Sequence, residues 1–264
     1  MSFLTSILAA KRDEIAAAKA RAPQAEVERL AAARLDPPRG FAAALDRSGV
    51  RVIAEIKRAS PSLGDIRPDL DPAATARAYA AGGAAALSVL TEPAYFKGSA
   101  SDLQAARAAV ALPVLRKDFI IDPYQVYETA AMGADAMLLI VRILDDAELG
   151  SLHALALGLG LDVLTEVFDA RDVERANALG ARLVGINNRD LAHFKTDASH
   201  ATRLAAQVRG DAAVVALSGI HGIDDLRLNL ATGIRRFLVG EALVREQDPT
   251  ATLRAWTGLP TPGA

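Results

Sequence analysis

An acidic and a basic side chain interrupt an apolar run near the start of the chain. Residues 53–60 read IAEIKRAS, in which Glu55 and Lys57 stand two positions apart. In a strand, positions i and i+2 point to the same side, so both side chains share one face with Ile53. A buried acid and base are costly unless each has a partner or a task. Similar interruptions recur at the ends of later apolar runs, at Glu92, Lys117, Glu166, Asn187, Arg189 and Ser218. This recurrence predicts a site.

Composition argues against several classes of protein. The 264 residues are 51% hydrophobic and 23% charged, which is typical of a globular chain with ample material for a core. The net charge of −2 argues against nucleic-acid binding, which normally requires a basic excess. Cysteine is absent and the four histidines show no metal-binding spacing, so we expect no metal site. We expect no cofactor either. The apolar start is too short for a signal peptide, and no segment is long enough to span a bilayer; we therefore expect a cytoplasmic location and no membrane partner.

Short apolar runs alternate along the chain with alanine-rich amphipathic segments. The runs predict strands at Val52–Lys57, Ala85–Thr91, Val114–Lys117, Ala136–Val141, Val163–Val167, Leu183–Asn187, Ala213–Ser218 and Arg236–Val239. The segments between them predict helices at Pro72–Ala81, Ser101–Val110, Pro123–Met132, Asp145–Leu157, Ala170–Leu179, Ser199–Val208, Ile223–Ala231 and Pro249–Trp256. Asp-Pro pairs at residues 71, 122 and 248 supply an N-cap before a proline at the first helical position.

Eight β–α pairs with near-continuous apolar strands predict the α/β class, as a single (β/α)8 TIM barrel. An open, doubly wound sheet is the alternative, but no Gly-x-Gly-x-x-Gly follows the first strand to support dinucleotide binding.

An N-terminal segment precedes the barrel pattern. Leu4, Ile7, Leu8 and Ile15 form a helical stripe, and residues 27–33 predict a second helix. We divide the chain into an N-terminal helical extension, residues 1–48, and the barrel, residues 49–264. These residues alone leave open whether the extension caps or flanks the barrel or covers its mouth as a lid.

The barrel prediction places the polar residues together, because catalytic groups in this fold come from the C-terminal ends of the strands. A phosphate site is also predicted after the last two strands, where residues 218–222 read SGIHG and residues 240–243 read GEAL. Glycine lets backbone N–H groups approach an anion, and a short helix starting at Gly240 would direct its positive end there. Arg189 offers a bidentate donor, and Ser60 and Ser62 offer hydroxyl groups from the first strand's loop.

Several longer strings resemble one family, the indole-3-glycerol phosphate synthases of tryptophan biosynthesis. They are AEIKRASPS at 54–62, AAALSVLTE at 84–92, YFKGS at 95–99, VLRKDF at 114–119, GADA at 133–136, TEV at 165–167, GINNRDL at 185–191, SGI at 218–220 and VGEAL at 239–243. The N-terminal extension is also similar to the family's helical segment over the active site, which favours packing on the barrel mouth.

The resemblance implies a phosphorylated small-molecule substrate, 1-(2-carboxyphenylamino)-1-deoxyribulose 5-phosphate, which is closed to the indole with loss of carbon dioxide and water. It implies that Lys117 is the general acid of ring closure and that Glu166 is the acid/base group of the later steps. Lys57 would attract the anthranilate carboxylate, Glu55 would orient Lys57 and bind substrate hydroxyl groups, and Asn187 would hold Glu166 or those hydroxyl groups. Ser218 joins the catalytic residues; Ser60, Glu92, Phe96, Phe119 and Arg189 are expected to bind substrate, and Ser60, Arg189, Gly219, Gly240 and Glu241 its phosphate.

The chain departs from the family pattern at two positions. The family usually has glutamate before the serine of the seventh strand, where this chain has Leu217, and the loss of an inward carboxylate should alter the charge balance of the site. Leu63 replaces a lysine of the family in the Ser-Pro-Ser loop, where we expect a small effect.

Other functions stay open at this point. A Schiff-base aldolase would use Lys57 or Lys117 as a nucleophile, and borohydride trapping would reveal it. A sugar-phosphate isomerase of the same pathway needs a thiol acid, which this chain lacks. Because Leu217 stands in place of the family's glutamate, a third alternative also stays open: a barrel that binds a phosphate or a protein without catalysing a reaction. The sequence also leaves open whether the protein associates with other tryptophan-pathway enzymes.

Overall fold

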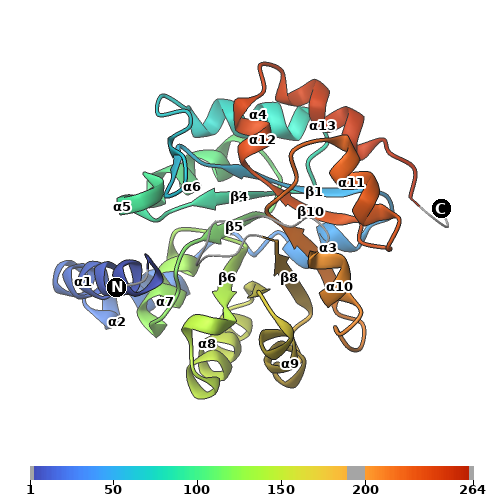
Figure 1. Cartoon of the computed structure of the whole chain (residues 1–264). Helices are drawn as coiled ribbons and strands as arrows, with labels where there is room; N and C mark the ends of the chain where they lie inside the picture. The colour runs from blue at the N-terminus through green and yellow to red at the C-terminus, as the bar shows by residue number, and fades with distance from the viewer. Residues whose placement is uncertain (1–2, 189–199, 262–264) are drawn as a thin grey trace.

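Eight parallel strands close into a barrel in the computed structural model, which describes residues 3–188 and 200–261 (Figure 1). The strands are β1 (Arg51–Ile56), β4 (Ala86–Leu90), β5 (Val114–Lys117), β6 (Ala136–Ile140), β7 (Asp162–Val167), β8 (Leu183–Asn187), β9 (Ala213–Leu217) and β10 (Arg236–Val239). Neighbours along the chain pair with one another, and β1 closes the barrel by pairing with β10. The predicted TIM barrel is confirmed, the open sheet is excluded, and every predicted strand lies within one residue of its observed ends.

Alternation along the strands separates two apolar layers. Ile53, Leu138 and Leu238 belong to a cluster inside the barrel, whereas Val52 and Ala54 belong to the cluster between strands and helices. Because Glu55 follows Ile53 by two positions, its side chain also points inward. The parallel strands are apolar on both faces because helices cover the outer one.

The outer layer consists of helices that follow the strands. They are α4 (Pro72–Ala81), α6 (Ala100–Ala109), α7 (Pro123–Ala131), α8 (Asp146–Gly158), α9 (Ala170–Leu179), α10 (His200–Ala205), α11 (Ile223–Leu230) and α13 (Pro249–Thr257). The predicted caps are present: the carboxylates of Asp71, Asp122 and Asp248 each accept a backbone N–H from the first turn of α4, α7 and α13. The predicted helix at 199–208 begins outside the described residues and ends earlier than expected, at Ala205.

The N-terminal extension contains α1 (Phe3–Arg21), α2 (Gln24–Ala32) and α3 (Phe41–Asp46). Figure 1 shows α1 and α2 beside α7, and both helices contact it. The sequence did not predict α3, which lies at the N-terminal ends of the strands: Phe41 and Leu45 join the inner apolar cluster, and Asp162 at the start of β7 accepts the N–H of Ala42 at 2.8 Å. The division of the chain at residue 48 stays a prediction.

Short elements shape the barrel mouth. They are the hairpin β2 (Ala59–Ser60) and β3 (Gly64–Asp65), α5 (Pro93–Phe96), the 3₁₀ turn η1 (Val141–Ile143) and α12 (Glu241–Arg245). Only α12 had been expected, as the short helix after Gly240.

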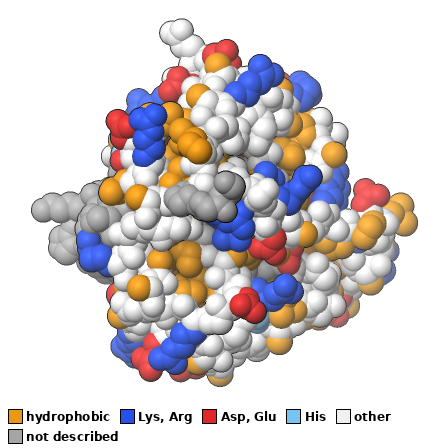
Figure 2. Space-filling model, turned by 90° about the vertical axis from the view of Figure 1, so that its right-hand side faces the viewer, with side chains coloured by type: hydrophobic (Ala, Val, Ile, Leu, Met, Phe, Trp, Pro, Cys, Tyr) orange, Lys and Arg blue, Asp and Glu red, His pale blue; other side chains and the backbone are white. Residues whose placement is uncertain are grey.

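The surface carries charges of both signs. On the face in Figure 2, basic and acidic side chains are interspersed with apolar and uncharged ones. Within residues 3–188 and 200–261, no helix is long and apolar enough to cross a bilayer.

Candidate active site

A pocket opens at the C-terminal ends of the strands, as this fold requires of an active site. It encloses about 1040 Å³, including its open mouth. All eight barrel strands supply lining residues at or just beyond their C-terminal ends, and α1 adds Leu4. Twelve of the fourteen predicted site residues line it: they are Glu55, Lys57, Ser60, Phe96, Lys117, Phe119, Glu166, Asn187, Ser218, Gly219, Gly240 and Glu241.

The two that remain are Glu92, which is buried elsewhere, and Arg189, which lies outside the described residues.

Glu55 and Lys57 form an ion pair on the inner face of β1. The distance from Lys57 Nζ to Glu55 Oε1 is 2.9 Å, and the two side chains are 12% and 7% exposed. Their i, i+2 spacing places them on the face predicted from the sequence. Gly240 lies against the pair, since a Cβ built there would be 2.3 Å from Glu55 Oε1. The end of β10 therefore has to be glycine for the pair to keep this position.

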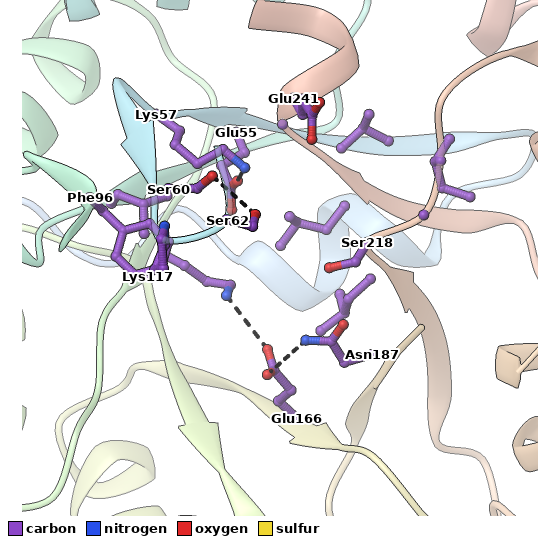
Figure 3. Close-up of a pocket in the computed structure, with 18 of the residues that line it drawn as sticks. Glu55, Lys57, Ser60, Ser62, Phe96, Lys117, Glu166, Asn187, Ser218 and Glu241 are labelled. Carbon is purple, nitrogen blue, oxygen red and sulfur yellow. Dashed lines mark hydrogen bonds and ion pairs between the residues drawn. The ribbon is translucent and has the colours of Figure 1, made fainter. Parts of the chain in front are cut away.

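Lys117, Glu166 and Asn187 meet across the pocket from three different strands (Figure 3). Lys117 Nζ lies 3.5 Å from Glu166 Oε2, and the Asn187 side-chain amide donates to Glu166 Oε1 at 3.1 Å. The Glu166 side chain is 3% exposed, and its Oε2 has no hydrogen-bond partner among the described residues. An ammonium and a buried carboxylate oxygen thus face one another in a space that can admit a substrate.

The loop after β9 turns sharply into the pocket. Ser218 has φ 62° and Gly219 has φ 72°, so two consecutive residues adopt the left-handed conformation. This conformation is uncommon for a residue with a Cβ, and such strain is concentrated at functional sites. The turn brings Ser218, Gly219 and His221 to the wall of the pocket that Ser60 of β2 also lines.

Two aromatic rings form one side of the pocket. The centroids of Phe96 and Phe119 are 6.4 Å apart and their planes are inclined by 41°. Phe96 ends α5, and the buried carboxylate of Glu92 caps that helix by accepting the N–H groups of its residues 94, 95 and 96 at 2.7–3.1 Å. Glu92 does not line the pocket, so its place in the structure is that of a cap that holds Phe96.

Several apolar lining residues were missed from the sequence. Leu90, Ile140 and Leu238 are the last inward-facing residues of their strands and line the pocket between the charged groups. Each of them stands one position before the end of its predicted strand, so the two-residue alternation of the strands could have found them. Leu217, which stands where the resembled family has glutamate, also faces the pocket; it pairs in register with Asn187 and is 1% exposed.

No group of three or more histidine, aspartate or glutamate side chains in the described parts of the chain could hold a metal ion. The polar groups of the pocket are instead two lysines, three glutamates, an asparagine, hydroxyl groups and a histidine. Such groups bind anions and move protons.

The fold and the pocket define a class first: a (β/α)8-barrel enzyme with acid/base groups and a glycine-lined end at the C-terminal mouth. A family model described as indole-3-glycerol phosphate synthase matches residues 4–256. A protein of that name from Desulfosudis oleivorans is 52% identical over 256 residues, which cover 96% of this chain and 97% of the relative. Another, from Rhizorhabdus wittichii, is 50% identical over 260 residues, or 97% of this chain and 98% of the relative.

Solved structures show the fold as well. A thiamine phosphate pyrophosphorylase from Pyrococcus furiosus aligns with a TM-score of 0.58 over 78% of this chain and 93% of that one, at 17% identity, which shows a shared fold alone. On the family match and the relatives, the chain belongs to the indole-3-glycerol phosphate synthase family. Its activity is that of a carboxy-lyase of tryptophan biosynthesis, acting on a phosphorylated small molecule.

Proposed function

We propose that Lys117 and Glu166 carry out the proton transfers of the family's reaction on 1-(2-carboxyphenylamino)-1-deoxyribulose 5-phosphate. The observation that carries this proposal is the 3.5 Å approach of Lys117 Nζ to Glu166 Oε2 at the centre of the pocket. A proton donor from β5 and a proton acceptor from β7, two strands separated only by β6, are held there within reach of one bound molecule.

In the first step, the ring carbon that bears the carboxylate attacks the ketone carbon, and a carbon–carbon bond forms. Lys117 donates a proton to the ketone oxygen, which becomes a hydroxyl group. The bond to the carboxylate then breaks, its electron pair returns to the aromatic ring, and carbon dioxide leaves. Lys57 attracts the carboxylate during binding, and its ion pair with Glu55 fixes the position of its ammonium.

In the last step, the new hydroxyl group leaves as water while a proton is lost from the neighbouring methylene carbon. Glu166 supports this dehydration by moving a proton, and Asn187 orients it through the 3.1 Å hydrogen bond to Oε1. Ser218 lines the same wall and belongs with these groups. Phe96 and Phe119 hold the aromatic ring of the substrate.

Both lysines already have carboxylate partners, Glu55 for Lys57 and Glu166 for Lys117. An ammonium has no lone pair with which to attack a carbonyl carbon, and these ion pairs place each ammonium beside a carboxylate, as a proton donor beside an acceptor; this favours acid/base chemistry over a Schiff base. Borohydride trapping of a lysine adduct during turnover would contradict this view.

The proposal is tested by mixing the pure protein with the substrate and following indole fluorescence. Lys117→Met keeps the side-chain length and removes the charge, and we expect kcat to fall by at least ~10²-fold with a smaller change in KM. Lys19→Met is a matched control, because Lys19 pairs with Asp122 at the surface of α1. A Lys117→Met variant that retains most of its turnover would remove Lys117 from the role of acid.

The phosphate is proposed to bind between the loops after β9 and β10. Gly219 and Gly240 allow its close approach, Ser60 adds a hydroxyl group, and Glu241 contributes its backbone N–H as the first residue of α12. Arg189 is kept as a further ligand of the phosphate, although it lies outside the described residues. Inorganic phosphate or sulfate should compete with substrate and, in a crystal, should occupy this end of the pocket. An anion bound elsewhere on the mouth would contradict the assignment.

We also propose that the N-terminal extension takes part in closing the mouth, since Leu4 of α1 lines the pocket. Removal of residues 1–8 should raise KM more than it lowers the melting temperature. A cytoplasmic location, without nucleic-acid or membrane partners, is proposed from the charged biosynthetic intermediate and the net charge of −2. Association with other tryptophan-pathway enzymes can be tested by co-purification.

A further inference from the structure

A lysine occupies the buried face of α1. Ile7, Lys11 and Ile15 are spaced four apart and are 0%, 1% and 7% exposed, so Lys11 lies in the middle of the stripe that packs on the barrel. Burying an ammonium is costly unless it is well paired. Lys11 Nζ lies 2.8 Å from Asp118 Oδ1 and 2.6 Å from Glu14 Oε2. Burial by itself would lower the pKa of Lys11, but these two carboxylates outweigh it and hold the pKa above its ordinary value.

Asp118, the main partner, directly follows Lys117 at the end of β5. Its carboxylate is fully buried and accepts from Thr91 Oγ1 at 2.6 Å, from the Phe119 N–H at 2.8 Å and from Arg116 at 3.1 Å, besides Lys11. Burial by itself would raise the pKa of Asp118, but the charges of Arg116 and Lys11 outweigh it and keep the pKa below its ordinary value. The carboxylate of Asp118 therefore stays charged, and these four donors hold it in place.

Arg116, on the other side of Lys117, is anchored equally well. Its guanidinium lies 2.7 Å from Glu128 Oε2, and it donates to Thr129 Oγ1 and to the carbonyl of Gln125 at 3.1 Å each. These partners belong to α7, so Arg116 ties β5 to the helix that follows it. Arg116 is 3% exposed.

The two neighbours of Lys117 in the sequence are thus held on the outside of the barrel, while Lys117 itself points inward to Glu166. Phe119 is held from the same network, since its N–H donates to Asp118 and its carbonyl accepts the Gln125 amide at 2.9 Å. Lys11 is the contribution of α1 to this network.

We propose that Lys11 is a positioning residue for the reaction: its ion pair with Asp118 fixes the end of β5, and with it Lys117 and Phe119, when α1 docks on the barrel. Leu4, at the pocket, lies seven positions before Lys11 and so on the same face of α1. The docking of one helix therefore places an apolar side chain at the mouth and completes the support of the proton donor. This inference rests on the proposed role of Lys117.

The chain offers a matched control on the same helix. Lys19 also carries a positive charge and also contacts the segment after β5, through Asp122 at 2.8 Å, but the two side chains are 41% and 28% exposed. Asp122 is four residues further from Lys117 than Asp118 is and caps α7. A role limited to attaching α1 would be shared by Lys11 and Lys19; a role in positioning belongs to Lys11.

The experiment compares Lys11→Met, Lys11→Arg and Lys19→Met by indole fluorescence, at a temperature where thermal melts show each variant to be folded. We expect Lys11→Met to lower kcat by ~10- to 100-fold with less than about a threefold change in KM, the scale of a displaced catalytic group. Lys11→Arg keeps the charge and should recover most of kcat, and Lys19→Met should keep both constants. An unchanged kcat for Lys11→Met with a lowered melting temperature would overturn the proposal.

A double variant separates positioning from stability. Lys11→Met with Asp118→Asn removes both charges of the pair, so no unpaired carboxylate is left buried and the fold should recover. Its kcat should stay low, because the link between α1 and β5 is still missing; wild-type turnover in this variant would refute the role of Lys11.

A last comparison separates this inference from the role proposed for Lys117. The role of Lys117 as proton donor is tested by the kcat of the single variant Lys117→Met. In the Lys117→Met background, adding Lys11→Met should cause little further loss, because residues that act as a unit are not additive. A fully additive loss would show that Lys11 does not act through Lys117.

Discussion

A methyl group added at Gly240 should disturb the chemistry while leaving the fold nearly intact. The backbone there has φ −118°, which any residue can adopt, so Gly240→Ala introduces no backbone strain. The new Cβ would lie 2.3 Å from Glu55 Oε1 and 3.1 Å from Lys57 Nζ. Both atoms end flexible side chains, so the overlap is relieved by moving the ion pair. Glu55 Oε1 has to retreat by about 1 Å to reach an ordinary contact distance.

The size of the effect follows from that displacement. A misplacement of about 1 Å in a catalytic or positioning group costs on the order of 10²-fold in rate, or ~2.7 kcal/mol of transition-state stabilisation. The fold loses no apolar contact, and we expect the free energy of unfolding to change by less than ~1 kcal/mol, or about 2–4 °C in melting temperature for a chain of this size. Gly240→Ala should therefore lower the activity strongly while it changes the stability only slightly.

The assay is steady-state indole fluorescence, with thermal unfolding followed by circular dichroism. Gly222→Ala is the matched control, because Gly222 lies in the loop after β9, has an extended backbone and has nothing within 4 Å of its Cβ position. It should keep wild-type kcat/KM. If Gly240→Ala also kept wild-type kcat/KM but melted several degrees lower, Gly240 would serve only the turn, and the argument from the ion pair would be wrong.

Three further changes test the site and the fold. Glu166→Gln should lower kcat by ~10²-fold or more, since the amide cannot move a proton although it can keep a bond to Asn187; near-normal turnover would exclude Glu166 from acid/base work. Leu217→Glu adds a carboxylate to the pocket, where Lys57 and Lys117 are already paired with carboxylates, so we expect repulsion of the anionic substrate to raise KM. The control Leu217→Met should leave KM unchanged, and equal KM values in the two variants would contradict this expectation. Burial lowers the pKa of His153, so the unfolded chain binds more protons at this residue than the folded chain does, and stability should fall as pH drops through about 6.5. His153→Leu should make this fall smaller in thermal melts between about pH 5 and 7. If the fall were unchanged in the variant, other groups would be its cause.

Local patterns determined a large part of this structure. The ends of the eight strands were predictable because apolar runs and their boundaries are short-range features, and the caps at Asp71, Asp122 and Asp248 use only neighbouring residues. The shared face of Glu55 and Lys57 follows from the two-residue repeat of a strand. Once eight β–α units are recognised, the fold itself gathers the strand-end residues at one mouth.

Two features became visible only in the tertiary structure: the cap formed by Glu92, whose expected contact with substrate stays a prediction, and the helix α3. Glu92 follows a strand end as a ligand would, yet its carboxylate is used by the N–H groups of α5. α3 was not predicted because six residues are too few for a helical repeat to stand out, and its apolar residues Phe41 and Leu45 face a barrel interior that exists only after the strands have closed.

The sequence alone determined which residues could do chemistry and on which side of each strand they point, because both depend on residue type and on a period of two. Only the tertiary structure decided which of them meet. Lys117 and Glu166 come from strands that are not neighbours, and their 3.5 Å approach depends on the closure of the whole barrel. From the sequence alone, Lys11 would be taken for a solvent-exposed charge on an amphipathic helix. In the structure, the packing of α1 buries Lys11 and places Asp118 2.8 Å away. Its role could not be predicted, because the energy of a buried charge depends on partners that are distant in the chain.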